Sequence, residues 1–244
     1  MVDSINTQYL PLWTEHDPRI PPRGRVVAAH IEQLDDAEFA VVGTVEEFER
    51  GETVPFDPSR QMKIVEAPET LRIEFDRSYR DKKSLALIAD IAAILGTEPQ
   101  PQVKKAVEPL SILTITAQAI LGGITAAVTK NLTDDALNRL KQKIALALKR
   151  RKESKREYVF QFEFVVIVGG REVQVDLLAT SPSENQISRI FDQHLAAVDG
   201  VLLRWLPTRS EIRRVVFDVG GEQPKFSYAV RSDVVVLYDG PLAV

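Results

Sequence analysis

The sequence predicts an α+β fold in which two small antiparallel-sheet units flank a central helical hairpin. Three observations lead to this prediction. Apolar and polar residues alternate in the first and last thirds of the chain, which is the period of half-buried strands. Glycine pairs in the last third suit tight hairpin turns. Between these thirds, residues 109–128 carry no charge, and a densely basic stretch with helical spacing follows directly.

The first unit is expected to span residues 1–96. Four prolines within residues 1–24 argue against a helix or a central strand, so this segment is predicted to be an extended arm packed on a surface. Residues 25–33 and 38–45 are predicted to be the two strands of a hairpin. Its apolar positions are Val26, Val27, Phe39, Val41 and Val42.

A second hairpin is predicted over residues 61–67 and 70–77, and a helix over Ser84–Leu95. The first residue of this helix is a candidate N-cap, and Gly96 is a candidate C-terminal glycine. Asp90 is its only charge, and its apolar residues cover most of its circumference. A helix of this kind is expected to be covered by the rest of the protein.

The central unit is expected to span residues 97–156, beginning with a proline-bearing linker over residues 97–109. In residues 110–128 the aliphatic positions lie three or four apart, as do the small polar ones, which favours a helix. The β-branched run Ile112–Thr116 favours a strand instead, and Gly122-Gly123 favours a break. Of these alternatives, we expect the helix.

The second arm of the central hairpin is predicted to begin at Thr133. Side-chain caps and acids over residues 133–135 suit a helix N-terminus, and four cations fall in the last turn, where the helix dipole favours them. The short link at residues 130–132 implies that the two arms are antiparallel. The apolar stripe of the second arm is formed by Leu137, Leu140, Ile144 and Leu148.

The last unit is expected to span residues 157–244, although the three units are also able to pack as one domain. A hairpin is predicted around Gly169-Gly170, and a helix over residues 183–198. This order indicates a mostly antiparallel sheet with a helix on one face. The predicted strands cover residues 158–168, 172–179, 201–206, 212–219, 225–230 and 234–238.

No residue pattern indicates an active site, so the sequence leans away from an enzyme. The chain has no cysteine, which excludes disulfides, thiolate catalysis and thiolate metal ligands, and its three histidines are far apart. Phosphate-binding glycine loops and serine nucleophile motifs are absent. We therefore expect no cofactor and no metal, and we assign no catalytic residue.

The segment Gly170–Leu178 is similar to the hairpin of restriction-type nucleases that carries their first metal-binding aspartate, which would be Asp176 here. Those enzymes place a Glu-x-Lys or Gln-x-Lys motif on the next strand to complete the metal site. In this chain the segment runs instead into Ser181-Pro182-Ser183 and a predicted helix. This departure argues against nuclease activity.

Charge is distributed unevenly along the chain, whose formal net charge is −4. Residues 1–103 carry 11 basic and 19 acidic side chains, whereas residues 130–156 carry 10 basic and 3 acidic ones. We expect the basic segment either to lie against acidic faces of the same protein or to contact an anionic partner. No aromatic residue interleaves it, which disfavours nucleic acid as that partner. The predicted contacts to an anionic partner are Lys149, Arg150, Arg151 and Lys152.

The leading hypothesis is a cytoplasmic, non-catalytic protein that works through self-assembly or protein-partner binding by its central helices. The N-terminus lacks a secretory signal, and the absence of cysteine fits the cytoplasm. The expected interface residues are Leu113, Ile120, Ile124, Leu137, Leu140, Ile144 and Leu148.

Two alternatives stay open. The first is a membrane effector released by a stimulus, in which the cationic helix would meet anionic lipid. The alternation of α+β units with an apolar insert resembles accessory modules of bacterial defence systems. The second alternative is an enzyme whose site assembles from scattered residues.

Overall fold

The computed structural model describes residues 2–13, 17–35, 38–49, 54–64, 71–76, 79, 81–101, 111–153 and 157–241. The helices are α1 (Val2–Thr7), α2 (Lys82–Leu95), α3 (Ile124–Thr129), α4 (Asp134–Glu153), α5 (Glu184–Arg189) and α6 (Leu195–Trp205), with a π-helical turn over Ile190–His194 and a 3₁₀ turn over Leu206–Thr208. The strands are β1 (Leu10–Leu12), β2 (Gly24–Asp35), β3 (Glu38–Glu47), β4 (Arg72–Phe75), β5 (Pro99–Pro101), β6 (Ser111–Ile120), β7 (Tyr158–Val168), β8 (Arg171–Thr180), β9 (Ile212–Asp218), β10 (Lys225–Arg231) and β11 (Val236–Leu237).

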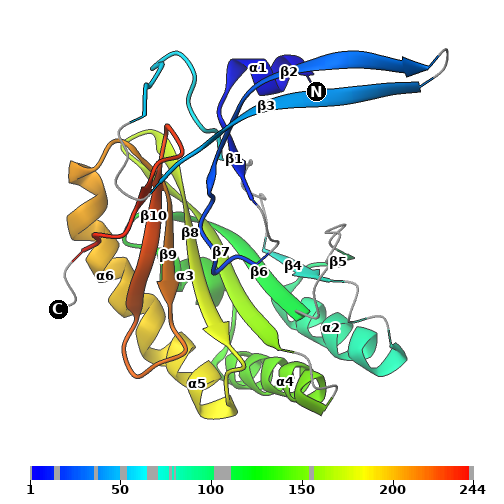
Figure 1. Cartoon of the computed structure of the whole chain (residues 1–244). Coiled ribbons are helices and arrows are strands. Elements are labelled where there is room, and N and C mark those ends of the chain that lie inside the picture. Colours follow the sequence, from blue (N-terminus) through cyan, green and yellow to red (C-terminus); the bar gives the residue numbers. More distant parts are fainter. Residues whose placement is uncertain are drawn as a thin grey trace.

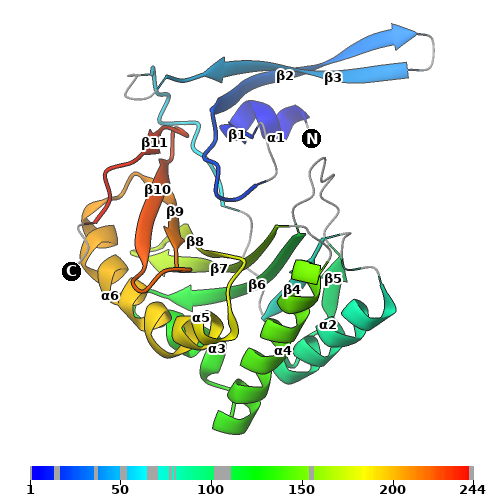
Figure 2. The ribbon, with the colours of Figure 1, turned by 60° about the horizontal axis from the view of Figure 1, so that its bottom comes forward.

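Eight strands form one mixed sheet in the order β11-β10-β9-β8-β7-β6-β4-β5. The pairs β4–β5, β6–β7 and β8–β9 are parallel, and the other neighbours are antiparallel. Helices α2 to α6 cover one face of this sheet, and α1, β1 and the β2–β3 hairpin lie on its other side (Figures 1 and 2). The main core lies between the sheet and the helices and includes Phe160, Phe162 and Phe164 of β7.

The predicted arrangement of two small sheet units around a central helical hairpin is wrong. β4 from the first third of the chain pairs with β6 from its centre, and β6 pairs with β7 from the last third. One sheet therefore runs through all three parts. Residues 111–120, expected to lie in the first arm of the helical hairpin, form an inner strand of this sheet. The protein has a mixed α/β fold with a separate three-stranded sheet, β1-β2-β3.

β6 is buried on both of its faces, which explains why its sequence pattern predicts a helix instead of a strand. Leu113, Ile115 and Ala117 point into the core beneath the helices, and Thr114 and Thr116 are buried on the opposite face. A strand of this kind reads as a continuous run of apolar and small residues, without the alternation of a half-buried strand. The β-branched run within it was the informative signal.

The segment after β6 confirms the expected break and the expected basic helix. Gly122 has a φ of 86°, which favours glycine. The Asp199 carboxylate on α6 accepts hydrogen bonds from the backbone N–H of Gly122 (3.0 Å) and Ile124 (3.2 Å), which fixes the start of α3. α4 begins after Thr133, whose hydroxyl oxygen accepts from the Ala136 N–H. Together α3 and α4 form the crossover that two neighbouring parallel strands require.

Most other predicted elements are confirmed, with shifted ends. The β2–β3 and β7–β8 hairpins form as expected, and the helix from Ser84 begins instead at Lys82, capped by Asp81. The strand predicted over residues 201–206 is wrong. These residues are helical instead, and Leu202 and Leu206 extend the buried stripe of α6.

The second predicted hairpin does not form as expected. Residues 61–64 are outside any strand, and β4 pairs with β6 instead. The rest of the first predicted strand lies outside the described residues.

The N-terminal segment is a packed arm, as expected, but it begins with helix α1, which ends before the first proline. Two adjacent residues, Pro18 and Arg19, fasten the arm to the sheet. The Tyr228 hydroxyl on β10 donates a hydrogen bond to the Pro18 carbonyl at 2.9 Å, and Arg19 forms an ion pair with Glu157 at 2.8 Å, just before β7. The arm therefore covers part of the sheet face that the helices leave open.

Candidate protein-interaction surface

The β2–β3 hairpin extends away from the eight-stranded sheet as a free arm (Figure 1). Directly paired residues of an antiparallel hairpin carry their side chains on the same face. The register pairs Ile31 with Val41 and Gln33 with Phe39, and a bulge after Val26 keeps the next pairs on that face. We call this the apolar face of the hairpin, formed by Val26, Ala29, Ile31, Gln33, Phe39, Val41, Gly43 and Val45.

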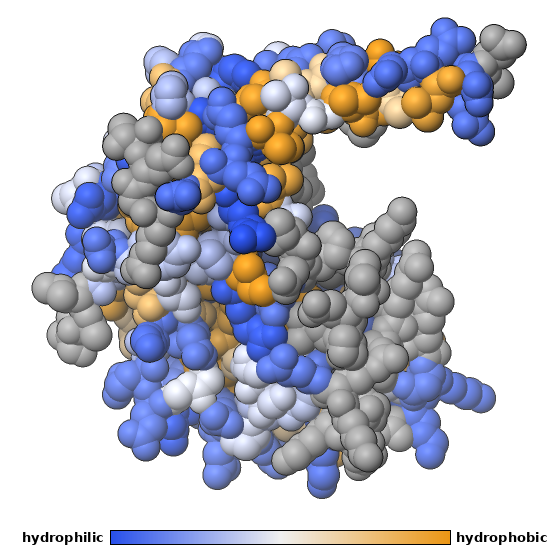
Figure 3. Space-filling model, viewed as in Figure 1, coloured by the Kyte–Doolittle hydropathy of each residue, from blue (hydrophilic) through white to orange (hydrophobic). Residues whose placement is uncertain are grey.

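This apolar face is largely uncovered. Ile31 is 61% exposed, Phe39 65%, Val41 45% and Val45 47%, and the first charged residue on this side is exposed Glu47, which pairs with Gly24 at the root. Figure 3 shows hydrophobic surface along the hairpin, on the side that looks toward the notch between the arm and the rest of the molecule. A two-stranded hairpin alone is marginally stable in water. Contiguous exposed apolar surface of this kind is a candidate binding site.

The root of the arm is held rigidly by one buried guanidinium group. Arg25 donates hydrogen bonds to the Glu46 carboxylate (2.8 Å) and to the carbonyl oxygens of Asp233 (3.2 Å) and Pro55 (2.6 Å). The Tyr9 ring packs on it, with the guanidinium carbon 4.1 Å from the ring centroid. Arg25 therefore ties both hairpin strands to the C-terminal part of the chain.

A second attachment fixes the arm along β2. The Asn6 side chain on α1 donates to the Ala29 carbonyl at 3.0 Å and accepts from the Ala29 N–H at 2.8 Å. β1 pairs with β2 nearer the root, so this edge of the hairpin is partly occupied. Within the described part of the chain, β3 has no neighbour on its outer side. The arm thus offers both an apolar face and an edge strand, the two features that protein partners use on sheets.

The tip of the hairpin is acidic. Glu32, Asp35 and Glu38 are exposed there. Glu32 pairs with Ala40 on the face opposite the apolar one. These charges lie outside the centre of the apolar face. They favour a partner that carries positive charge where it contacts the tip.

Asp176, the aspartate of the nuclease-like segment, lies in a buried polar network. It is fully buried, and its carboxylate accepts hydrogen bonds from Arg214 (2.5 Å), Gln161 (3.1 Å) and Gln174 (3.1 and 3.2 Å). The Trp13 ring lies 4.8 Å from the Arg214 guanidinium. Protein donors thus occupy the carboxylate, and the described residues contain no group of three or more side chains suited to a metal ion. We interpret this network as a structural one.

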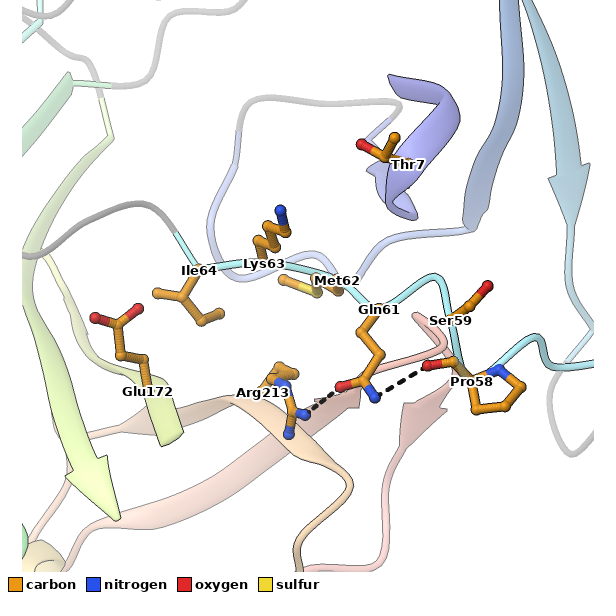
Figure 4. Close-up of a pocket in the computed structure, with 9 residues that line it drawn as sticks. All are labelled: Thr7, Pro58, Ser59, Gln61, Met62, Lys63, Ile64, Glu172 and Arg213. Carbon is orange, nitrogen blue, oxygen red and sulfur yellow. Dashed lines mark hydrogen bonds between the residues drawn. The ribbon is translucent and has the colours of Figure 1, made fainter. Parts of the chain in front are cut away.

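A hollow of about 580 Å³ lies beneath α1, between residues 58–64 and the starts of β8 and β9 (Figure 4). Arg213 donates to the Gln61 side-chain oxygen at 2.6 Å, and Gln61 donates to the Pro58 carbonyl at 3.3 Å. The same guanidinium group donates to the carbonyl oxygens of Ser210 and Ile212. Two polar side chains of this hollow, Arg213 and Gln61, therefore hold residues 58–64 against β9.

The predicted interface residues lie mostly inside the protein's own core. Ile120 is 69% exposed at the end of β6. Leu137 is partly buried. Their predicted contacts with a partner stay predictions. The fully buried residues of the set are Leu113, Ile124, Leu140, Ile144 and Leu148.

The predicted cationic contacts lie at the end of α4. Lys149 is exposed, and the side chains of Arg150, Arg151 and Lys152 lie outside the described residues. Nearer the middle of α4, Lys141 pairs with Asp192 and Lys143 with Asp90, each at 2.5 Å. Part of the basic charge is therefore neutralised within the chain. No helix in the described residues is long and apolar enough to cross a membrane.

The sequence predicts the hairpin but does not identify its exposed face. The signal was present, because Phe39, Val41 and Val45 continue a strict alternation. The pattern does not reveal that these residues stay exposed in the described part of the structure.

Comparison of the chain with protein-family models, curated proteins and solved structures finds no match.

Proposed function

We propose that this protein is an interaction module that docks the apolar face of its β2–β3 hairpin on another protein chain. One observation carries the proposal: four large apolar side chains, between 45% and 65% exposed, share the apolar face of an anchored arm. Because Arg25 and Asn6 hold the root in place, the arm loses little conformational freedom when it binds.

The size of the apolar face supports binding of moderate strength. Burying a large apolar side chain contributes about 1.5–3 kcal/mol when it starts fully exposed. Each of the four starts about half exposed, so each contributes roughly 1 kcal/mol. Phe39, the most exposed of the four, is the best candidate for the residue that dominates binding.

The proposal keeps the expected partner binding but moves its site from the central helices to the hairpin. Most of the apolar residues of α3 and α4 are used by the protein's own core. The membrane alternative treated residues 109–128 as a releasable helix, yet residues 111–120 are an inner strand. We therefore do not carry that alternative forward.

Site-specific photo-crosslinking in the producing cell tests the proposal. A photoreactive phenylalanine analogue in place of Val41 reports on the apolar face, and the same analogue in place of exposed Thr44 reports on the opposite face. We expect a discrete protein adduct from position 41 only, and its loss in the Phe39→Glu variant. No adduct from position 41, or equal adducts from both positions, would contradict the proposal.

A further inference from the structure

The outer edge of β3 presents backbone hydrogen-bonding groups to solvent. On the other strand of the hairpin, the Ala29 N–H and C=O point away from β3, because both bond to the Asn6 side chain. Ala29 is directly paired with Gly43 of β3. Directly paired residues of antiparallel strands either bond to each other twice or both point outward. The N–H and C=O of Gly43 therefore point away from β2, toward the open edge.

The apolar residues of β3 share this direction. Inward and outward backbone groups alternate along a strand, so Phe39 and Val41 also direct their N–H and C=O groups to the open edge. Within the described part of the chain, β3 has no strand on this side and no other residue bonds to these groups. The residues that form the centre of the apolar face are therefore also those whose backbone is available to a partner.

We propose that an extended segment of the partner pairs with β3 over residues 38–43 and adds a strand to its open edge. The inference rests on the proposed function and states how the partner binds. Because side chains alternate along a strand, every second residue of the added segment lies on the apolar face, beside Phe39 and Val41. These residues need to be apolar. In strand addition the main-chain hydrogen bonds supply affinity, and the alternating side chains supply specificity.

The intervening residues of the added segment lie on the opposite face, where the hairpin carries its acids. A residue directly opposite Glu38 has its side chain on the same face as Glu38, with the two Cβ atoms about 5 Å apart. Glu38 is exposed, and Glu32, which pairs with Ala40, lies on that face as well. Toward the root, Glu46 is already paired with Arg25 at 2.7 Å. The added segment therefore needs a basic residue beside Glu38.

The charge of the hairpin argues against a second copy of the hairpin as the added segment. Residues 24–47 contain six acidic residues and one arginine. That arginine, Arg25, is buried at the root and bonded within its own chain. Two such hairpins side by side would bring acids close to acids, which is how edge strands avoid pairing with their own copies. The occupant is instead a different protein chain, in which apolar residues alternate with basic ones.

Photo-crosslinking from position 41 in variants of Gly43 tests the backbone pairing. Gly43→Pro removes the outward N–H and places a ring at the edge, a position where strands tolerate proline. Gly43→Ala keeps the N–H, and its added Cβ meets no atom closer than 3.6 Å. We expect Gly43→Pro to lower the adduct yield about ten-fold, because it leaves a partner carbonyl without a donor. Gly43→Ala is expected to leave the yield unchanged.

Amide hydrogen exchange of the purified protein gives a second measurement. The Ala40 and Val42 N–H groups face β2 and are expected to exchange slowly in both Gly43 variants, which shows that the hairpin is intact. The Phe39 and Val41 N–H groups are expected to exchange fast, and to slow when a synthetic octapeptide of alternating valine and lysine is added. An octapeptide of alternating valine and glutamate is the control. Glu38→Lys is expected to remove the preference for the lysine peptide.

Equal adduct yields from Gly43→Pro and Gly43→Ala would overturn the edge pairing. So would a valine–lysine peptide that leaves the Phe39 and Val41 amides unprotected at millimolar concentration. In either case an adduct from position 41 of the parent hairpin leaves the proposed function standing, whereas no adduct from the parent removes both.

Discussion

Two buried arginines, Arg25 and Arg214, join parts of this protein that are far apart in the sequence. Arg25 bonds to three residues around the root of the hairpin arm. Arg214 bonds to Asp176 between neighbouring strands and lies beneath Trp13 of the N-terminal arm. Burial lowers the pKa of Arg214 and the Asp176 carboxylate raises it, with a net upward direction, so this arginine stays charged and depends on its partner.

Replacing Asp176 by asparagine tests that dependence. Asp176→Asn leaves the buried Arg214 charge without its hydrogen-bonded counter-charge, which is expected to lower the free energy of unfolding by about 3–5 kcal/mol in urea titrations. The double variant Asp176→Leu/Arg214→Met removes both charges and is expected to recover most of that loss. A single variant as stable as the parent would show that the pair does not hold this part of the sheet together.

The Arg19–Glu157 contact gives the arm a pH dependence. Hydrogen bonding from Arg19 lowers the pKa of Glu157, so the folded protein binds this proton less readily than the unfolded chain. The contact therefore stabilises the fold above the ordinary pKa of glutamate, and this contribution is lost as pH falls below about 4. Glu157 is about half exposed, which makes the effect small.

Urea unfolding across a pH series measures this effect. The parent is expected to be more stable than Glu157→Gln at pH 7, and the difference should shrink toward zero near pH 3. A difference that stays constant with pH would mean that the Glu157 charge does not fasten the arm.

At the scale of elements, the hairpin depends on a close backbone approach at its root. A Cβ added to Gly24 would lie 1.9 Å from the Glu46 carbonyl oxygen, whereas one added to Gly43 would meet its nearest atom, Val26 Cγ1, at 3.6 Å. Gly24→Ala is therefore expected to lower the free energy of unfolding by about 1–3 kcal/mol, the range for overpacked sites. Gly43→Ala is expected to stay close to the parent. Thermal unfolding of both variants compares them, and equal melting temperatures would refute the close approach.

The elements that the sequence predicts correctly are those with one buried face. The β2–β3 hairpin shows period-2 alternation, and α4 shows a helical stripe with caps, so local pattern is sufficient for both. β6 fails because it is buried on both faces, and the end of α6 fails because short apolar runs suit a strand or a helix equally. The single sheet could not be predicted, since its pairings β4–β6, β6–β7 and β8–β9 join segments whose local patterns do not specify a partner.

At the scale of the whole molecule, the two sides of the sheet have different roles. The helices seal one face into the main core, and the other face carries the N-terminal arm and the root of the hairpin (Figure 2). The uneven charge of the sequence is only partly resolved inside the fold. Lys141 and Lys143 find acidic partners on neighbouring helices, while the acids at the hairpin tip face solvent. Among the described residues, the hairpin arm combines exposed apolar side chains with an acidic tip.

For the candidate surface, the sequence predicts which residues share a face but not that this face is exposed. The alternation that places Phe39 and Val41 on one face is written in the sequence. Their exposure follows from how the sheet assembles from distant strands: among the described residues α1 and β1 reach the β2 side of the arm, but Phe39 and Val41 stay 65% and 45% exposed.

Thiol protection tests the central claim, that another chain covers the apolar face of the hairpin. The chain has no cysteine, so a single introduced cysteine is the only thiol of this protein that a maleimide reagent labels. The labelling rate of Val41→Cys, on the apolar face, is compared with that of Thr44→Cys, on the opposite face, in extracts of the producing cell. The comparison is then repeated with Phe39→Glu added to each cysteine variant. We predict that Val41→Cys reacts about ten-fold more slowly than Thr44→Cys, and that Phe39→Glu abolishes the difference. Equal, fast labelling at both positions in the unaltered hairpin would contradict the account.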